Sequence, residues 1–233
     1  ASVDFPKIAL HDVEDANGKH FLLLSGPEPD YQWNRFLSAI ELVVEKYGVE
    51  LAIGLSAIPW PLPHTRPLGL TVHGNKPELL FGAGSVIGEI EVPGHVGALL
   101  ELHLGQCGLN SMGITAQVPH YLVQFEYPQG ALALLDGLMA GPDIVIPRGD
   151  LSDSAAQSLA NITEQLSGNE EFSAVVQALE AQYDQIAEAL SAGARGLPDA
   201  DIPSGDQIAA QVEAFLAEVD SAKDSDKDKD LDL

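Results

Sequence analysis

The feature that most constrains this fold is an alternation of short apolar runs with longer amphipathic segments along the first 150 residues. Five apolar runs have the length and flanking turn residues typical of buried strands: 21–25, 51–56, 68–72, 114–118 and 144–146. Runs that are apolar throughout, instead of alternating with polar residues, indicate a largely parallel sheet covered on both faces. Residues 1–150 are therefore predicted to form a three-layer α/β domain.

Segments with helical periodicity separate these runs. Apolar side chains of 36–47 fall on one helical face, Asp30 is placed to cap that helix, and Gly48 is placed to end it. Two further helices are predicted after Pro93-Gly94 and over 129–139. This order of elements is typical of an α/β domain with helices on both faces of its sheet.

Residues 151–220 are predicted to be helical. Two apolar seams, 155–166 and 172–190, repeat at spacings of three and four residues on either side of Gly168-Asn169. They predict an antiparallel helical hairpin appended to the α/β domain, followed by a third helix over 208–219. Two alternatives stay open for the seams: they dock on the α/β domain, or they contact another subunit.

Charge and composition exclude several classes of partner. The chain has 35 acidic and 11 basic residues, a net charge of −24, which argues against binding to nucleic acid or to an anionic membrane surface. No apolar run approaches the roughly 18 residues of a membrane span. The last residues, 221–233, alternate Asp and Lys and are expected to form a disordered acidic tail.

The residues that commonly bind metals do not form a recognisable motif. The seven histidines are scattered, without an i, i+4 pair of histidines on a helix, so no metal site is predicted. A single cysteine, Cys107, excludes an internal disulfide and any multi-cysteine zinc site within one chain. Because Cys107 ends an apolar helix, we expect it to be a small buried hydrophobe. No cofactor is predicted.

Polar residues gather in loops that follow predicted strands. The loop 26–33 follows the first strand, the proline-rich loop 58–67 follows the second, and Pro119-His120-Tyr121 follows a third. Parallel sheets tend to build their sites at the carboxyl ends of strands. The candidate residues for binding a ligand or partner are Glu28, Asp30, Trp33, His64, Thr65, Arg66, His120 and Tyr121.

Two interpretations of these loops stay open. In one, they form a ligand or partner surface; an Arg–Thr–His loop can hold an anionic substrate while an imidazole moves protons, as a small-molecule hydrolase or transferase would require. In the other, they are structural: Asp30 caps a helix, Arg66 pairs with a carboxylate and the prolines fix the loop shape. No set of residues requires a catalytic function.

Three ordered motifs resemble a known family. Gly26-Pro27-Glu28-Pro29-Asp30 with Trp33, Pro63-His64-Thr65-Arg66-Pro67, and Gln117-Val118-Pro119-His120-Tyr121 are similar to the proteasome assembly chaperone 2 family in its actinobacterial branch. The resemblance runs from about residue 21 to 147. It implies a phosphorylase/hydrolase-like α/β fold and a soluble, cytoplasmic, oligomeric protein, with no established activity for bacterial members.

The resemblance therefore favours a non-catalytic binding or assembly-chaperone-like protein over an enzyme. It also implies a homo-oligomer, for which we expect a trimer before a dimer. Family members usually carry a preceding strand–helix unit, so the chain is expected to lack one such unit. Archaeal relatives dock onto proteasomes through a C-terminal motif whose tyrosine is not found in Asp230-Leu231-Asp232-Leu233.

Overall fold

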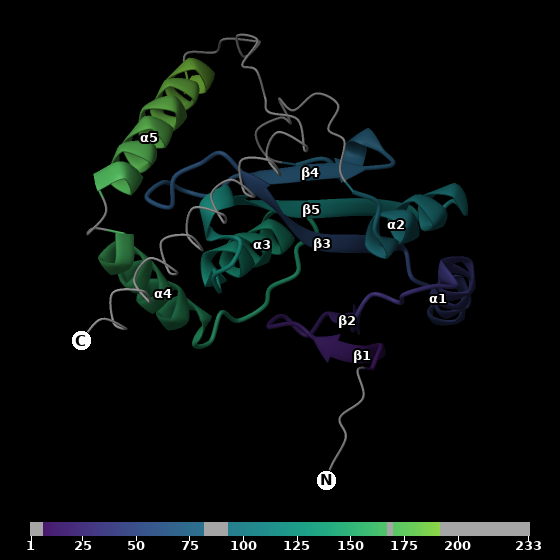
Figure 1. The fold of residues 1–233 in the computed structure, drawn as a ribbon. Coiled ribbons are helices and arrows are strands. Elements are labelled where there is room, and N and C mark those ends of the chain that lie inside the picture. The colour runs from purple at the N-terminus through teal and green to yellow at the C-terminus, as the bar shows by residue number, and fades with distance from the viewer. Residues whose placement is uncertain (1–6, 82–92, 167–169, 192–233) are drawn as a thin grey trace, which may run out of the picture.

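The centre of the molecule is a mixed sheet flanked by helices (Figure 1). The computed structural model of the protein describes residues 7–81, 93–166 and 170–191. The central sheet has the order β3-β5-β4 and consists of Leu51–Trp60 (β3), Leu70–Gly74 (β4) and Asn110–Pro119 (β5). β3 and β5 pair in parallel along their whole length, whereas the shorter ladder between β4 and β5 is antiparallel. The sheet is thus mostly parallel, as predicted.

The direction of β4 differs from the parallel orientation expected for run 68–72. The loop 61–69 connects β3 to β4, and it contains no helix. A parallel connection needs a crossover of about a dozen residues or more, so this shorter loop turns β4 back antiparallel. The predicted strand 144–146 is also wrong: this segment is not a strand, although Ile144 is buried and its N–H donates to the Leu138 carbonyl.

The first strand of the prediction lies outside the central sheet. Ala9–Glu14 (β1) and His20–Ser25 (β2) form a separate antiparallel hairpin. The sequence did not reveal β1, because most of its side chains are exposed and it has no apolar run. The buried Asp15 accepts hydrogen bonds from the N–H groups of Lys19 and Val145, which ties the hairpin turn to the body. These backbone bonds hold the pKa of Asp15 below its usual range.

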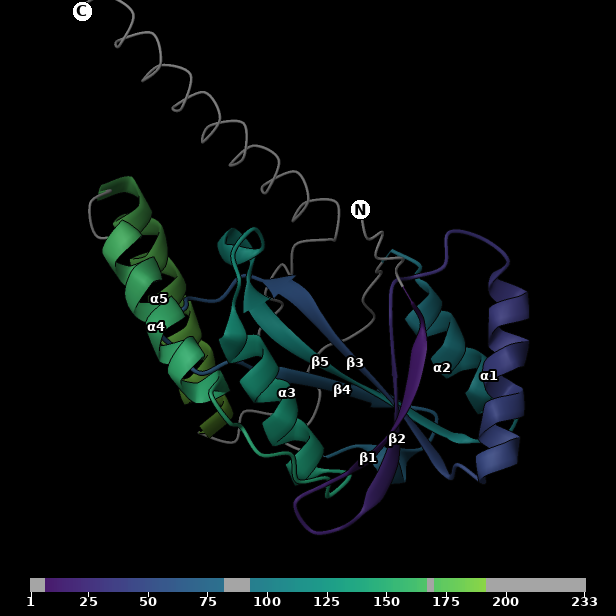
Figure 2. The ribbon, with the colours of Figure 1, turned by 90° about the horizontal axis from the view of Figure 1, so that it is seen from below.

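Helices cover both faces of the sheet (Figure 2). Val96–Gln106 (α2) packs on one face, with Trp33–Tyr47 (α1) outside it, and Pro128–Ala140 (α3) packs on the other. On the α3 side, a Cβ at Gly137 would lie 2.9 Å from Leu70 Cδ1 and 3.1 Å from Ile114 Cγ2, so a larger residue there would require these side chains to shift. The buried core on this side contains Val72, Met112, Ile114, Leu138 and Ile144.

Helix α1 begins later than its predicted cap. Its N-cap residue is Gln32, in the left-handed region with φ 61°, and no side chain caps the helix. The expectation that Asp30 caps α1 was therefore wrong. At the other end, Gly48 adopts the left-handed conformation (φ 63°) that ends the helix, as predicted.

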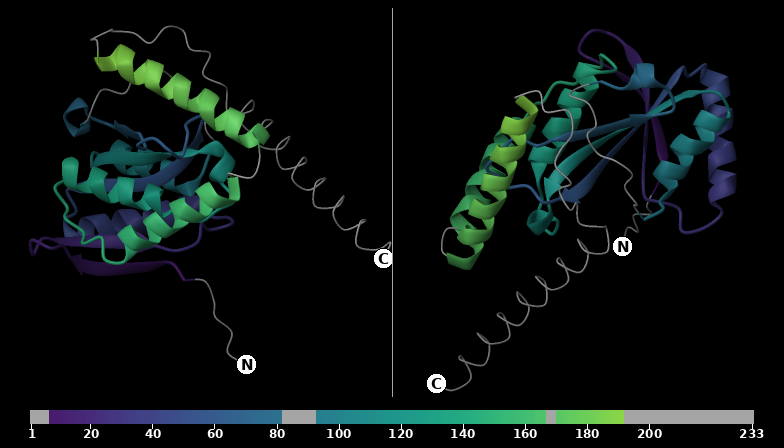
Figure 3. Two further views of the ribbon diagram at one scale, coloured as in Figure 1. Left: turned by 90° about the vertical axis from the view of Figure 1, so that its left-hand side faces the viewer. Right: turned by 90° about the horizontal axis from the view of Figure 1, so that it is seen from above.

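Two consecutive helices follow the α/β body, Leu151–Leu166 (α4) and Glu170–Ser191 (α5). Figure 3 shows both at the same end of the body. α4 packs mainly against α3, and a buried cluster joins both helices to the short 3-10 helix His120–Leu122 (η2). This cluster contains Tyr121, Leu122, Ile162 and Phe172. Within the described residues, the two seams thus pack on the body; the antiparallel hairpin stays a prediction.

A second short 3-10 helix, Pro77–Leu79 (η1), follows β4. The predicted third helix over 208–219 and the acidic tail 221–233 lie outside the described residues. Among the helices that the structure describes, none has the length and apolar character that crossing a membrane requires.

Candidate functional site

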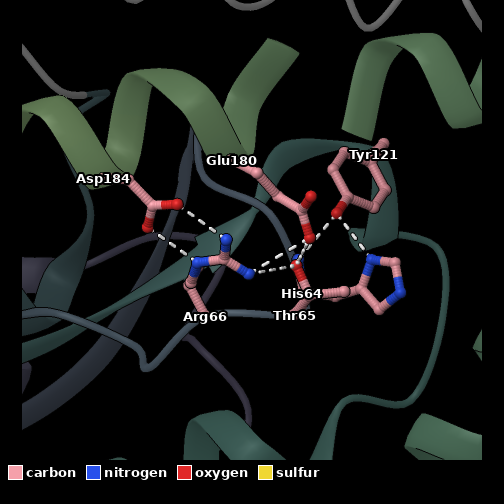
Figure 4. A network of polar contacts seen from close by, with 6 residues as sticks. All are labelled: His64, Thr65, Arg66, Tyr121, Glu180 and Asp184. Carbon is pink, nitrogen blue, oxygen red and sulfur yellow. Dashed lines mark hydrogen bonds and ion pairs between the residues drawn. The ribbon is translucent and has the colours of Figure 1, made fainter. Parts of the chain in front are cut away.

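The loop after β3 carries a cluster of polar side chains that faces α5 (Figure 4). His64, Thr65 and Arg66 lie on this loop and meet side chains from two distant elements. The stiff prolines on either side of them hold the loop, and Pro63 is fully buried. The side chains that they meet are Tyr121 from η2 and Glu180 and Asp184 from α5.

Arg66 is the centre of the contact with α5. Its Nε lies 2.8 Å from Asp184 Oδ1 and its second terminal nitrogen lies 2.7 Å from Oδ2, a bidentate pair. The remaining terminal nitrogen lies 3.2 Å from Glu180 Oε1, and the Thr65 hydroxyl donates to the same oxygen. Asp184, with a smaller contribution from Glu180, raises the pKa of Arg66, and Arg66 lowers the pKa of Asp184. We call Thr65, Arg66, Glu180 and Asp184 the Arg66 latch.

His64 forms a second, more buried part of the cluster. The Tyr121 hydroxyl lies 2.8 Å from both the backbone nitrogen and the ring Nδ1 of His64. Burial lowers the pKa of His64 and raises that of Tyr121. With a neutral ring, the hydroxyl accepts the backbone N–H and donates to Nδ1, so both of its bonds are satisfied.

His120 lies on the other side of Tyr121. Its ring contacts that of Tyr121 edge to face, with the centroids 5.4 Å apart, and its Nδ1 lies 3.4 Å from the Trp60 carbonyl oxygen. Burial lowers the pKa of His120. Both histidines beside Tyr121 therefore favour the neutral state, which suits packing against an aromatic ring.

The structure places the residues of loop 26–33 elsewhere. Glu28 Oε1 accepts the N–H of Val96 at 2.7 Å, so this carboxylate lies at the positive end of α2. Trp33 Nε1 donates to the Pro29 carbonyl at 2.6 Å. Within the described residues, no hydrogen bond, ion pair or ring contact links Glu28, Asp30 or Trp33 to the Arg66 latch.

The eight candidates thus separate into two groups. His64, Thr65, Arg66, His120 and Tyr121 adjoin one another, whereas Glu28, Asp30 and Trp33 belong to a different part of the fold. The sequence analysis missed the two acidic partners on α5. Their signal in the sequence is an i, i+4 acidic pair beside the apolar seam of that helix, a pattern that is equally typical of a solvated face.

The chemistry of the Arg66 latch is that of a closed structural contact. One guanidinium faces two carboxylates, so its charge is already compensated, and the Arg66 side chain is 30% exposed. An anionic substrate would have to displace Glu180 or Asp184 to reach Arg66. For Arg66, the arrangement supports the structural interpretation of this loop, in which the arginine pairs with carboxylates.

A different set of side chains gathers atoms that can bind a metal. Glu41 of α1, His103 of α2 and Cys107, which directly follows α2, place one potential ligand atom each within 4.8 Å of one another. Cys107 is exposed, so the expectation of a small buried hydrophobe was wrong. It follows the last turn of α2 at the protein surface, where the apolar periodicity of the helix no longer governs burial.

Comparison with known proteins identifies the family. The model of the PAC2 family matches residues 1–166. The chain belongs to the PAC2 family. This membership confirms the resemblance carried by the three loop motifs. None of the curated proteins matches the sequence.

Solved structures of other PAC2-like proteins resemble this one. A Mycobacterium tuberculosis protein of unknown function is 40% identical, with a TM-score of 0.78 over 84% of this chain and 67% of the other. A Corynebacterium glutamicum protein of unknown function is also 40% identical, with a TM-score of 0.74, covering 81% and 70%. A PAC2 family protein from Streptomyces avermitilis is 27% identical, with a TM-score of 0.62, covering 73% and 72%.

Proposed function

We propose that this PAC2 family protein is a non-catalytic binding protein of the assembly-chaperone type. The observation that carries the proposal is the closed Arg66 latch. A cation held by two carboxylates is unsuited to capturing an anionic substrate, and it is well suited to fixing a helix. A Mycobacterium tuberculosis protein described as a proteasome-assembly chaperone homologue is a structural neighbour with 23% identity. Its similarity to this chain is one of fold.

The proposal includes self-association in the cytoplasm. Several large apolar side chains are exposed on the described surface, including Leu42 and Tyr47 on α1 and Leu102 on α2. Apolar surface of this kind is a source of binding energy between subunits. We favour a homo-oligomer, a trimer before a dimer. The net charge of −24 on each chain opposes this association at low salt, because the chains repel one another.

Ligand screening by thermal shift separates this function from a small-molecule hydrolase or transferase. We expect that no anionic metabolite stabilises the full chain, because no such ligand competes with Glu180 and Asp184 for Arg66. Arg66→Ala and His64→Ala serve as site variants, and Arg148→Ala, which removes an exposed arginine paired with Asp136, is the matched control. A metabolite that stabilises the wild type and the control, and neither site variant, would favour the enzyme.

Association is tested directly by light scattering and by capture of partners. The full chain is measured at two salt concentrations, and we expect an oligomer that higher salt strengthens, because salt screens the repulsion between acidic chains. Capture from an actinobacterial lysate should recover the same protein repeatedly. A monomer at both salt concentrations, with no reproducible partner, would contradict the proposal.

A further inference from the structure

The seam between α1 and α2 holds three side chains whose potential ligand atoms lie close together. We call Glu41, His103 and Cys107 the α1–α2 cluster. Glu41 Oε2 lies 3.1 Å from His103 Nε2, and Glu41 Oε1 lies 3.4 Å from Cys107 Sγ. The distance from Cys107 Sγ to His103 Nε2 is 3.9 Å. None of these residues takes part in the Arg66 latch.

The spacing of these atoms is close to that of ligands around one metal ion. Zinc lies about 2.3 Å from a cysteine sulfur and about 2.0–2.2 Å from histidine nitrogen and carboxylate oxygen, which places tetrahedral ligands about 3.3–3.6 Å apart. The distances of 3.1 and 3.4 Å run to different oxygens of Glu41, the sulfur–nitrogen distance is 3.9 Å, and one ligand atom from each residue lies within 4.8 Å of the other two. Binding of one ion would therefore draw one Glu41 oxygen, the imidazole nitrogen and the sulfur slightly closer together.

Regular helices position the three ligands. His103 lies on α2 and Cys107 is the C-cap residue of that helix, four positions later. The N–H of Cys107 donates to the His103 carbonyl at 3.0 Å, which continues the helical turn and keeps the two residues one turn apart. Glu41 faces them from within α1, which packs against α2. Ligands on packed helices keep their geometry better than ligands on loops.

The surroundings of the cluster are negative. Glu45 follows Glu41 by one turn of α1, and its charge reaches Cys107. Desolvation of the sulfur by neighbouring atoms, followed by Glu41 and Glu45, raises the pKa of the exposed Cys107 thiol. Among the described residues, no lysine or arginine forms an ion pair with Glu41, whose carboxylate contacts His103 and Cys107. A cation would supply the charge that this seam lacks.

We infer that Glu41, His103 and Cys107 form a binding site for a divalent transition-metal ion with the ligand preferences of Zn²⁺. Thiolate, imidazole and carboxylate together suit Zn²⁺ better than Mg²⁺ or Ca²⁺, which prefer oxygen ligands. On binding, the thiol proton leaves to solvent and the sulfur–metal bond forms. Glu45 or a water molecule completes the tetrahedron. The ion clamps α1 to α2.

Metal binding is measured on the full chain without an affinity tag, stripped of metal and kept reduced. Zn²⁺ is titrated calorimetrically in excess Mg²⁺, which occupies nonspecific carboxylate sites, and Co²⁺ is titrated spectroscopically. We expect one ion per chain, a thiolate-to-cobalt charge-transfer band and a higher thermal midpoint with Zn²⁺. Absence of the band, or one ion shared between two chains, would overturn a site within one chain.

Substitutions identify the ligands. Cys107→Ser should abolish the charge-transfer band, and Glu41→Gln and His103→Ala should each weaken Zn²⁺ binding at least about tenfold. The matched control is His73→Ala, because His73 also pairs with a glutamate, Glu101, at 2.7 Å, and lies outside the cluster. Circular dichroism of the metal-free variants checks their folding. Equal binding by Cys107→Ser and by the wild type would overturn the proposal.

Discussion

Two polar clusters of this protein each join a helix to another element, and they differ in charge balance. In the Arg66 latch, a guanidinium meets two carboxylates of α5, so donors and acceptors are matched. In the α1–α2 cluster, a carboxylate, an imidazole and a thiol face one another. Both use side chains four residues apart, Glu180 and Asp184 on α5 in the first, and His103 and the C-cap residue Cys107 at the end of α2 in the second.

The comparison shows that spacing alone does not define a site. An i, i+4 pair places two side chains on one helical face, and the facing element decides what they do. Opposite Arg66, the α5 carboxylates complete a structural contact. Opposite Glu41, the α2 side chains leave a set of acceptors that a cation can complete.

Loss of the apolar anchor beneath the latch should have the largest effect. Phe172 is buried against Tyr121 at a ring distance of 5.1 Å, and Phe172→Ala should lower the free energy of unfolding by about 3–5 kcal/mol. Val175→Ala, at an exposed position on the same helix, is the control. Chemical denaturation measures both. Equal effects of the two variants would show that Phe172 does not anchor α5.

Removal of one hydroxyl beside the latch should have a smaller effect. Tyr121→Phe deprives the buried His64 of its partner at both the backbone N–H and Nδ1, which should cost about 1–2 kcal/mol of unfolding free energy. Tyr31→Phe, at a side chain that is 74% exposed, should change stability little. If the two variants unfold alike, the His64–Tyr121 contact contributes no stability.

Breaking the latch itself should act locally. Arg66→Ala removes the ion pairs to Glu180 and Asp184, so amides of α5 should exchange hydrogen faster while those of α1 and α2 stay protected. Arg148→Ala removes a comparable exposed pair with Asp136 and should leave α5 unaffected. Unchanged exchange in α5 of the Arg66 variant would show that its apolar face alone holds the helix.

The pH dependence of stability should be the smallest effect. It has opposite signs for the two histidines beside Tyr121 and for His73, which pairs with Glu101. Burial lowers the folded-state pKa of His64 and His120, so their contribution is full above the unfolded pKa of about 6.5 and decreases as pH falls through the folded values. Glu101 raises the pKa of His73, so its contribution is full below about 6.5 and is lost as pH rises through the folded value.

Thermal midpoints between pH 8 and pH 5 measure this balance. His73→Ala removes the group that gains stability in acid, so its midpoint should fall more steeply on acidification than that of the wild type. His20→Ala is a control for a histidine whose pKa is raised by the exposed Asp12. A shallower fall in the His73 variant would contradict the assigned signs.

Much of the fold was predictable from local sequence. The strands β3 and β5, the helices α1 to α5 and the stop at Gly48 follow from apolar periodicity and turn chemistry, which depend on near neighbours along the chain. The loop motifs were also sufficient to indicate the PAC2 family. Of the candidate site, the sequence supplied His64, Thr65, Arg66, His120 and Tyr121, which the fold brings together.

Only the tertiary structure decided which residues these side chains meet. Arg66 and Asp184 are 118 positions apart, and Glu41 and Cys107 are 66 apart, so no local pattern joins them. The antiparallel direction of β4 and the separate β1–β2 hairpin are likewise properties of the assembled fold. Periodicity determines which face a helix buries. Which charged side chain lies opposite that face depends on how the elements dock. Arg66 opposite α5 makes a closed latch, whereas Glu41 opposite His103 and Cys107 makes a metal site.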